Sequence, residues 1–204
     1  MKGHWNERYA ENEAAYGRKP NKFFATSLGE LENSDSDGGK SLLLPCDGEG
    51  RNAVYAAKRG WDVCSFDNST VGVEKSNRWA SEAGVEIDSK LADAFEFKPE
   101  RKFDVVALIF AHMPLEMRLT FHNRVKNWLT PGGTLIIEGF HKDQLGLGSG
   151  GPKKLDMLFD EETIRDDFSE FEILSIIKTI QTLDEGPFHQ GKAITLQFRA
   201  KSLT

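Results

Sequence analysis

From residue 40 onward, strand-like and helix-like segments alternate along the chain, and this alternation restricts the possible folds more than any other feature of the sequence. Apolar runs such as SLLLPC (41–46), WDVCSFD (61–67) and FDVVALIF (103–110) are typical of buried strands. Amphipathic stretches that end in glycine, RNAVYAAKRG (51–60) and STVGVEKSNRWASEAG (69–84), indicate the helices between them. Because strands that alternate with helices pair in parallel through right-handed crossovers, the sequence predicts a doubly wound α/β sheet.

The remaining segments extend this pattern over a single domain, residues 1–204. The further expected elements are a helical cap with a flexible linker over residues 1–39 (the linker SDSDGGK reaching Lys40), a weak strand within 85–97, a helix over 114–133 that ends at Pro131-Gly132-Gly133, and a strand over 134–140. The core then spans 40–204. Its last two strand-like runs, 171–186 and 191–201, predict a terminal hairpin that inserts one antiparallel strand into the sheet.

Composition restricts the partners that the chain can have. The net charge of −6 argues against a nucleic acid, because phosphate binding requires a clustered basic face. No apolar run approaches the ~18 residues that cross a bilayer, and the polar N-terminal stretch is unlike a secretory signal, so a cytoplasmic location is expected. Cys46 and Cys64 are expected to be reduced core residues, and the five histidines lack the spacing of metal ligands. The chain is expected to be a monomer or a homodimer.

The sharpest motif is Asp47-Gly48-Glu49-Gly50-Arg51-Asn52, directly after one strand and at the start of a helix. Glycines there let the backbone approach a ligand closely, and the helix N-terminus offers unpaired amides. With Ala53 the spacing reads G-x-G-x-x-A, which also fits a dinucleotide-binding fingerprint. The motif alone therefore indicates an adenosyl-type cofactor without deciding which one.

Two further positions fit the same ligand. Asp67 ends the second strand, where a carboxylate can accept both hydroxyls of a ribose; the alternative is a residue that caps the following helix. Asp93 and Ala94 follow the third strand, where a short polar side chain can face an adenine; the alternative is an ordinary surface loop. A dinucleotide is disfavoured because the chain is too short for a separate substrate domain and lacks a Tyr-x-x-x-Lys pair.

These residues carry a recognisable pattern. The segments that carry it are WNERYAENEAAYGRKPNKFF, DGEGRNAVYAA, IFAHMP, LTPGGTLIIEGF, GSGGP and DEGPFHQGKA, in this order along nearly the whole chain. The chain resembles class I methyltransferases that use S-adenosylmethionine (SAM), and within them the tellurite-resistance (TehB-like) and thiopurine methyltransferase group. The resemblance implies a Rossmann-like, seven-stranded sheet that is mostly parallel with an antiparallel C-terminal strand.

The resemblance also implies a set of cofactor-binding residues at the carboxyl ends of the strands and in the N-terminal cap. They are Tyr16, Asn21, Cys46, Asp47, Gly48, Glu49, Gly50, Asp67, Asn68, Asp93, Ala94, Phe110 and Ala111. The glycine loop would hold the methionine part of SAM, and Tyr16 and Asn21 would close over the cofactor. One departure stands out: members of the family usually carry an acidic residue and then a glycine at the end of the first strand, where this chain has Leu44 and Cys46. Asp47 can supply the missing carboxylate.

Three side chains are candidates for acting on the methyl acceptor. His112 follows the fourth strand, His189 lies at the tip of the hairpin with Glu185 four residues earlier, and Arg51 lies at the mouth of the glycine loop. Each has a structural alternative, because His112 can hold its loop, His189 can be a surface turn residue and Arg51 can form a salt bridge. A sulfonium is already a good leaving group, so the protein supplies proximity and, for a hard nucleophile, a base.

The sequence therefore predicts an enzyme that transfers the methyl group of SAM to a small molecule and releases S-adenosylhomocysteine. A thiol or a chalcogen oxyanion is the favoured kind of acceptor. Two alternatives stay open: an NAD(P)-dependent oxidoreductase and a non-catalytic regulatory module that binds SAM. Preference for SAM over a nicotinamide cofactor would distinguish the predicted enzyme from the oxidoreductase. Turnover of SAM to S-adenosylhomocysteine would distinguish it from the regulatory module, which would bind SAM without consuming it.

Overall fold

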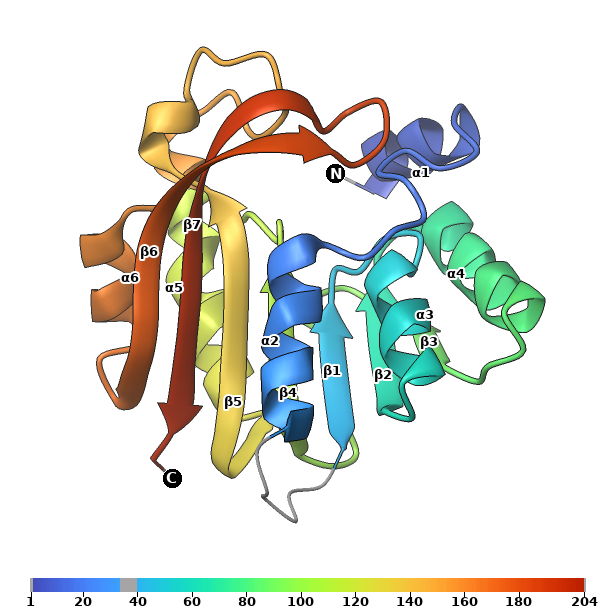
Figure 1. The fold of residues 1–204 in the computed structure, drawn as a ribbon, viewed down its shortest axis with the longest axis horizontal. Coiled ribbons are helices and arrows are strands. Elements are labelled where there is room, and N and C mark those ends of the chain that lie inside the picture. The colour runs from blue at the N-terminus through green and yellow to red at the C-terminus, as the bar shows by residue number, and fades with distance from the viewer. Residues whose placement is uncertain (1, 34–39, 204) are drawn as a thin grey trace.

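A seven-stranded sheet runs through the computed structural model, which describes residues 2–33 and 40–203 (Figure 1). The strand order is β3-β2-β1-β4-β5-β7-β6. The strands are β1 (Ser41–Pro45), β2 (Asp62–Asp67), β3 (Asp88–Leu91), β4 (Phe103–Ile109), β5 (Leu129–Phe140), β6 (Phe171–Asp184) and β7 (Gln190–Ser202). The first five pair in parallel, and β7 pairs antiparallel with both β5 and β6. The predicted doubly wound sheet with an inserted antiparallel strand is confirmed.

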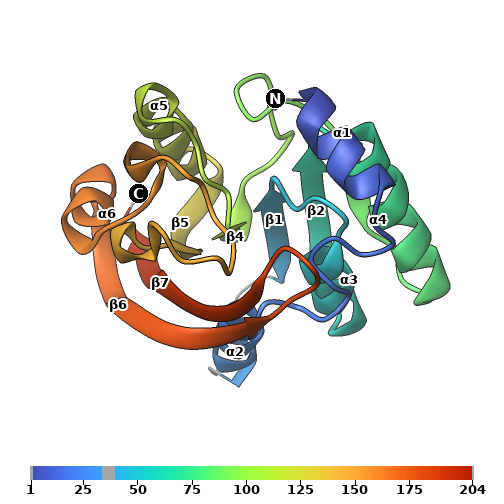
Figure 2. The ribbon, with the colours of Figure 1, turned by 90° about the horizontal axis from the view of Figure 1, so that it is seen from above.

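Helices cover both faces of the sheet (Figures 1 and 2). They are α1 (Lys2–Ala10), α2 (Lys22–Asn33), α3 (Arg51–Lys58), α4 (Thr70–Glu82), α5 (Leu115–Lys126) and α6 (Glu161–Asp167), with short 3-10 turns η1 (Lys142–Gln144) and η2 (Leu155–Met157). The helices α2 and α3 lie on one face, and α5 and α6 lie on the other. The predicted linker falls on residues 34–39, which lie outside the described residues.

Strand β1 shows why these apolar runs form central strands. Leu42 and Leu44 face the core beneath α2 and α3, whereas Leu43 faces the core beneath α5 and α6. A continuous apolar run is required because side chains alternate between the two covered faces of a parallel sheet. All three leucines are fully buried.

The predicted helix over 114–133 is too long. The helix ends at Lys126, and the next strand already begins at Leu129. The amide of Phe103 donates to the carbonyl of Trp128 at 2.8 Å, which draws this segment into the sheet. Leu115, one of the apolar residues with helical spacing in this segment, is about half exposed. Tertiary pairing therefore overrides the helical spacing of the apolar residues here.

The strand order reverses direction between β1 and β4, and ligands of open α/β sheets bind outside the carboxyl ends of the strands at such a point. In Figure 2, which looks down on those ends, α1 lies on one side of them and the β6–β7 hairpin curves in from the other. The fold thus brings the N-terminal cap, the loop after β1 and the hairpin to one place. None of the helices in residues 2–33 and 40–203 has both the length and the apolar character that crossing a bilayer requires.

Candidate functional site

Backbone strain marks the carboxyl ends of the two central strands. Cys46, after β1, has a φ of 57°, and Phe110, after β4, has a φ of 55°. Among the non-glycine residues of the described chain, these two alone adopt positive φ. The left-handed conformation costs a residue with a Cβ about 1–2 kcal/mol, and such strain clusters at ligand sites. Cys46 makes, with strain, a turn that a glycine would make without it.

Two carboxyl groups lie beside this strain: Asp47 is partly buried and Asp67 is buried. Burial raises the pKa of Asp47 to about 7, although hydrogen bonds from Asn52 and Ala53 favour its ionised form. Burial likewise raises the pKa of Asp67 to about 6. Each carboxylate is short of positive partners, so a cationic ligand would stabilise both.

Asp67 also organises the loops around it. Its carboxylate accepts from the amide of Gly48 at 3.0 Å and from the amide of Ser69 at 2.8 Å. An ionised carboxylate has about four lone-pair sites, so acceptors remain for ribose hydroxyls. Ser69, not Asp67, caps α4, since its hydroxyl accepts from the amide of Gly72 at 3.1 Å.

The N-terminal cap covers the glycine loop. A Cβ built on Gly48 would lie 2.4 Å from the hydroxyl oxygen of Tyr9, so α1 packs directly on the loop. A Cβ on Gly50 would lie 2.1 Å from Oγ of Ser76, so this glycine permits close packing against α4. One oxygen of the buried Glu49 carboxylate pairs with Nζ of Lys75 at 2.9 Å. The contact of Glu49 with a cofactor stays a prediction.

Four further residues expected to contact the cofactor follow the carboxyl ends of β2, β3 and β4. Asp93 is exposed just after β3, and its carboxylate accepts from the amide of Phe95 at 2.8 Å, which closes a tight turn. Asn68 is half-buried beside Asp67, whereas Ala94 and Ala111 are buried and offer only backbone or apolar contact. All four therefore lie at the strand ends as predicted, and their contact with a cofactor stays a prediction.

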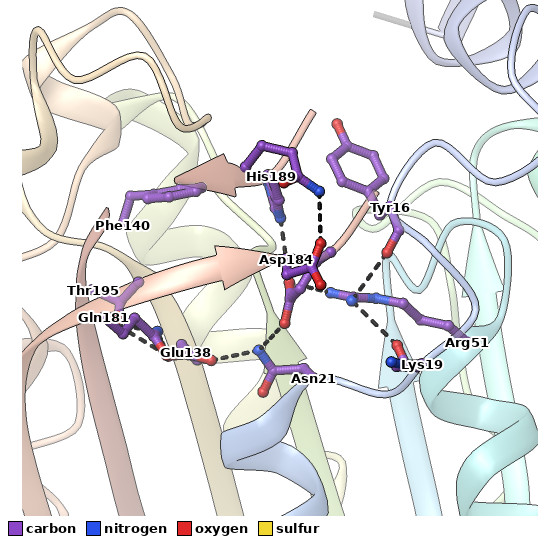
Figure 3. A network of polar contacts seen from close by, with 12 residues as sticks. Tyr16, Lys19, Asn21, Arg51, Glu138, Phe140, Gln181, Asp184, His189 and Thr195 are labelled. Atoms are coloured by element: carbon purple, nitrogen blue, oxygen red, sulfur yellow. Dashed lines mark hydrogen bonds and ion pairs between the residues drawn. The ribbon is translucent and has the colours of Figure 1, made fainter. Parts of the chain in front are cut away.

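Arg51 and Asn21 contact other protein groups, although the sequence suggested the methyl acceptor for Arg51 and the cofactor for Asn21. Arg51 donates to the carbonyls of Tyr16 (3.1 Å) and Lys19 (3.3 Å) and pairs with Glu185 at 2.8 Å, as Figure 3 shows for the two carbonyls. Asn21 is fully buried, and its oxygen accepts from the amide of Phe24 at 2.9 Å. Both side chains are committed to protein partners, so the structure speaks against Arg51 as an acceptor contact and Asn21 as a cofactor ligand.

A buried carboxylate that the sequence analysis did not select, Glu138, lies at the centre of this network (Figure 3). It accepts from Nδ2 of Asn21 at 2.5 Å. Three further donors, Gln181, Thr195 and Gln197, reach its other oxygen at 2.8, 3.0 and 2.9 Å. The available signal was a single charged residue inside the apolar strand TLIIEGF. Glu138 joins β5, β6, β7 and the cap beneath the site.

His189 lies among aromatic rings at the edge of the site. Its ring centroid is 4.5 Å from that of Tyr16, 4.5 Å from that of Phe110 and 5.2 Å from that of Phe140. Burial lowers the pKa of His189, against the opposing effect of Glu185, so the ring is neutral at neutral pH. The hydroxyl of Tyr16 accepts from Arg8 at 2.9 Å and remains free to donate. His189 is therefore a candidate contact for the acceptor, and it is buried rather than a surface turn residue.

His112 is committed to the backbone instead. Nδ1 contacts the carbonyl of Met157 at 2.7 Å, and Nε2 accepts from the amide of Phe140 at 2.9 Å. Burial lowers the pKa of His112 to about 4. Since neither nitrogen is free for a proton, the prediction of a substrate contact is replaced by the structural alternative. Within the described chain, no three side chains of His, Cys, Asp or Glu are grouped to hold a metal ion.

A sequence profile described as a methyltransferase domain matches residues 44–133, which run from β1 into β5. The match covers less than half of the 204 residues. The matched segment includes the glycine loop, Asp67, Asp93 and the strained Phe110. No protein of curated function matches the sequence.

Solved structures share the fold of this chain at low sequence identity. TehB from Haemophilus influenzae is 17 % identical with a TM-score of 0.70 over 87 % of this chain, and the chain spans 62 % of the TehB chain. The N-methyltransferase NodS from Bradyrhizobium japonicum WM9, in complex with S-adenosyl-L-homocysteine, is 14 % identical with a TM-score of 0.73 over 100 % of this chain and 98 % of its own. Magnesium protoporphyrin IX methyltransferase from Synechocystis PCC 6803, with bound SAM, is 17 % identical with a TM-score of 0.65 over 88 % and 77 %.

The profile match supports the predicted class, a methyltransferase, and the shared fold confirms the predicted Rossmann-like architecture. Two of these neighbours were crystallised with SAM or its product, which is consistent with SAM as the predicted cofactor. The resemblance to the TehB-like group is supported by one neighbour.

Proposed function

We propose that the chain transfers the methyl group of SAM to a small-molecule acceptor, with a thiol or a chalcogen oxyanion as the favoured kind. The observation that carries the proposal is a pair of carboxyl groups at the carboxyl ends of β1 and β2, the partly buried Asp47 and the buried Asp67. SAM brings a sulfonium and an ammonium group to such a site. Two carboxylates whose pKa values are raised by burial favour a cationic ligand.

The same carboxylates disfavour the oxidoreductase alternative. A dinucleotide would place its anionic pyrophosphate against the glycine loop, beside Asp47 and Asp67. Like charges at close range in a buried site destabilise each other. The acidic loop therefore supports SAM over NAD(P).

The residues of the site fit the cofactor in three parts. The loop of Asp47, Gly48 and Gly50 would hold the methionine part, Asp67 with Asn68 the ribose, and Asp93 the adenine. When bound, SAM supplies an activated methyl group on a sulfonium. The chain contributes alignment and the exclusion of water, since α1 covers the loop and the aromatic rings around Phe110 cover the other side.

His189 is the chain's own candidate for receiving the acceptor. A neutral imidazole beside Phe110 can accept a hydrogen bond or a proton from a thiol, and the surrounding rings favour a soft, weakly hydrated nucleophile. The acidic net charge supports a small molecule over a nucleic acid.

Calorimetric titration with SAM, S-adenosylhomocysteine and NAD(H) tests the cofactor. Micromolar binding of the adenosyl pair, about −8 kcal/mol, without binding of NAD(H) is expected. Binding of NAD(H) alone would overturn the proposal. Turnover is then followed as formation of S-adenosylhomocysteine with a thiol such as 2-mercaptoethanol and with tellurite. Tight SAM binding without turnover of any acceptor would support the regulatory module instead.

A further inference from the structure

A buried chain of polar contacts connects the N-terminal cap to the hairpin directly beneath His189 (Figure 3). Nδ2 of Asn21 donates to Glu138 at 2.5 Å and to Glu185 at 3.3 Å. Arg51 donates to the same Glu185 at 2.8 Å. Glu185 in turn contacts Nδ1 of His189 at 3.4 Å. Arg51 and Nδ1 of His189 thus share Oε2 of Glu185, and Asn21 donates to Oε1.

The hairpin turn is pressed against the cap in a way that leaves little freedom. Gly186 has a φ of 75°, and a Cβ built on it would lie 2.4 Å from the amide nitrogen of Gly17 and 2.7 Å from the carbonyl oxygen of Ala15. The turn itself is closed by the amide of Glu185, which donates to the carbonyl of His189 at 2.9 Å. Close backbone contact therefore fixes the turn that carries both members of the Glu185–His189 pair.

The charges around the pair determine whether Glu185 is ionised and which nitrogen of His189 carries the proton. Burial disfavours ionisation of Glu185, but the hydrogen bond from His189 and the charge of Arg51 outweigh burial and hold the pKa of Glu185 below its usual value. An ionised carboxylate can only accept, so Nδ1 of His189 must carry the proton in this contact. The other nitrogen, Nε2, then bears the lone pair. Among the described residues, the hydrogen bond of the His189 ring is the one at Nδ1.

The other groups that face His189 do not compete with Glu185 for the proton on Nδ1. Arg51 and Arg8 are cationic and oppose protonation of the ring. His112 is neutral, and its two nitrogens are occupied by backbone groups. The ring of Tyr16 packs edge-on against His189 at 4.5 Å. Glu185 is therefore the acidic group that sets the tautomer.

We propose that Glu185, held by Asn21 and Arg51, is the positioning residue that keeps the proton of His189 on Nδ1 and leaves Nε2 free for the methyl acceptor. The role of Nε2 toward a methyl acceptor rests on the proposed function. The tautomer of His189 does not, because it is a property of the protein without ligands. A carboxylate that orients a histidine in this way fixes both the ring and the nitrogen that reacts. The Nδ1 contact of 3.4 Å is expected to shorten when the site closes on its ligands.

The tautomer can be read by long-range ¹H–¹⁵N correlation spectra of the full chain labelled at its five histidines. The His189→Asn variant assigns the signals. At neutral pH we expect His189 to be neutral with its proton on Nδ1. A proton on Nε2 in the wild-type spectrum would overturn the proposal, whether or not any variant folds.

The Glu185→Ala variant tests the cause. It removes the acceptor of the Nδ1 proton, so the His189 signals should shift toward the Nε2–H tautomer. Asp184→Asn is the matched control, because Asp184 is an exposed neighbour on the same hairpin that bonds to Gln190. Its spectrum should match the wild type. A folded Glu185→Ala protein with the proton still on Nδ1 would show that Glu185 does not set the tautomer.

Calorimetry with SAM separates this test from the proposed function. If SAM does not bind the wild-type protein, the proposed function fails, while the tautomer result stands by itself. If SAM binds wild type and Glu185→Ala with similar affinity while the tautomer changes, Glu185 acts on His189 and not on the cofactor, as proposed.

Discussion

Asp47 brings binding and stability into opposition at a single residue. Its pKa in the folded protein is about 7, above the ordinary value of 3.8 that it regains on unfolding. A carboxyl group whose folded pKa is raised stabilises the fold below its unfolded pKa, and this contribution is lost as the pH rises through the folded pKa. The ligand-free protein should therefore lose stability between about pH 4 and pH 7, where burial opposes ionisation.

The Asp47→Asn variant should remove this loss. Each pKa unit corresponds to about 1.4 kcal/mol, so the variant should gain up to a few kcal/mol over the wild type between about pH 5 and pH 8. Part of the gain is offset because an amide cannot accept from both Asn52 and Ala53. Thermal unfolding at the two pH values measures the difference, and calorimetry should show weaker SAM binding at about pH 8. Parallel pH profiles for the two proteins would contradict the burial of an unpaired carboxyl group.

Cys46 offers a separate measure of the strain at the site. Replacement by alanine keeps the Cβ and the strained φ of 57°, whereas replacement by glycine relieves the strain. Cys46→Gly should therefore be more stable than Cys46→Ala by about 1 kcal/mol, the reverse of the usual order of these two residues. Urea denaturation of both variants gives the comparison. An alanine variant as stable as the glycine variant would mean that the turn is not strained.

At the scale of elements, Lys75 on α4 holds α1 in place. Its ammonium group is buried, pairs with Glu49 and donates to the carbonyls of Tyr9 and Asn12 at the end of α1. These carbonyls are the unsatisfied groups of a helix C-terminus, where a cation is favourable. Since Tyr9 lies against Gly48, the same contact keeps the glycine loop covered.

Replacing Lys75 by methionine should loosen this cover. The variant leaves Glu49 buried without its cation, which typically costs 3–5 kcal/mol. The double variant Lys75→Met/Glu49→Gln should recover most of that stability while α1 remains unanchored. Amide hydrogen exchange in α1 should then be faster than in the wild type for both proteins. Unchanged exchange in α1 of the double variant would show that other contacts hold the helix.

The sequence predicted those helices and strands that a local pattern determines. The strands β1 and β2 were evident from their apolar runs, and the helices α3 and α4 from amphipathic stretches that end at Gly60 and Gly84, both of which have positive φ. The end of α5 was not, because pairing of Phe103 with Leu129 decides it and sequence spacing does not contain that contact.

The site divides in the same way. The loop that holds Asp47 and the strand end that holds Asp67 could be predicted, because each lies at a fixed place in a βαβ unit. The partners of Asn21 and Arg51 could not, since these side chains meet Glu138 and Glu185 across more than a hundred residues of sequence. A lone charge in an apolar strand was the only local sign of Glu138.

At the scale of the whole molecule, the site is assembled from three segments that are distant in sequence. The cap around α1 contacts the loop after β1 through Tyr9, and residues 15–17 contact the hairpin turn through Gly186. Arg51, at the start of α3, connects the loop to both of the others. A ligand that orders one of these segments should therefore order the others, because each contact is shared.

Hydrogen exchange with and without S-adenosylhomocysteine tests this coupling. Protection should rise together in α1, in residues 46–50 and in the turn 185–189, although of these only residues 46–50 are expected to touch the cofactor. The segment 161–175, in α6 and the start of β6, lies beyond the network and serves as the internal control. Arg51→Met should keep protection at residues 46–50 and lose it at the turn, because the connection to Glu185 is cut. Protection confined to residues 46–50 in the wild type would mean that the cap and the hairpin respond to other ligands, and that the cofactor site forms without them.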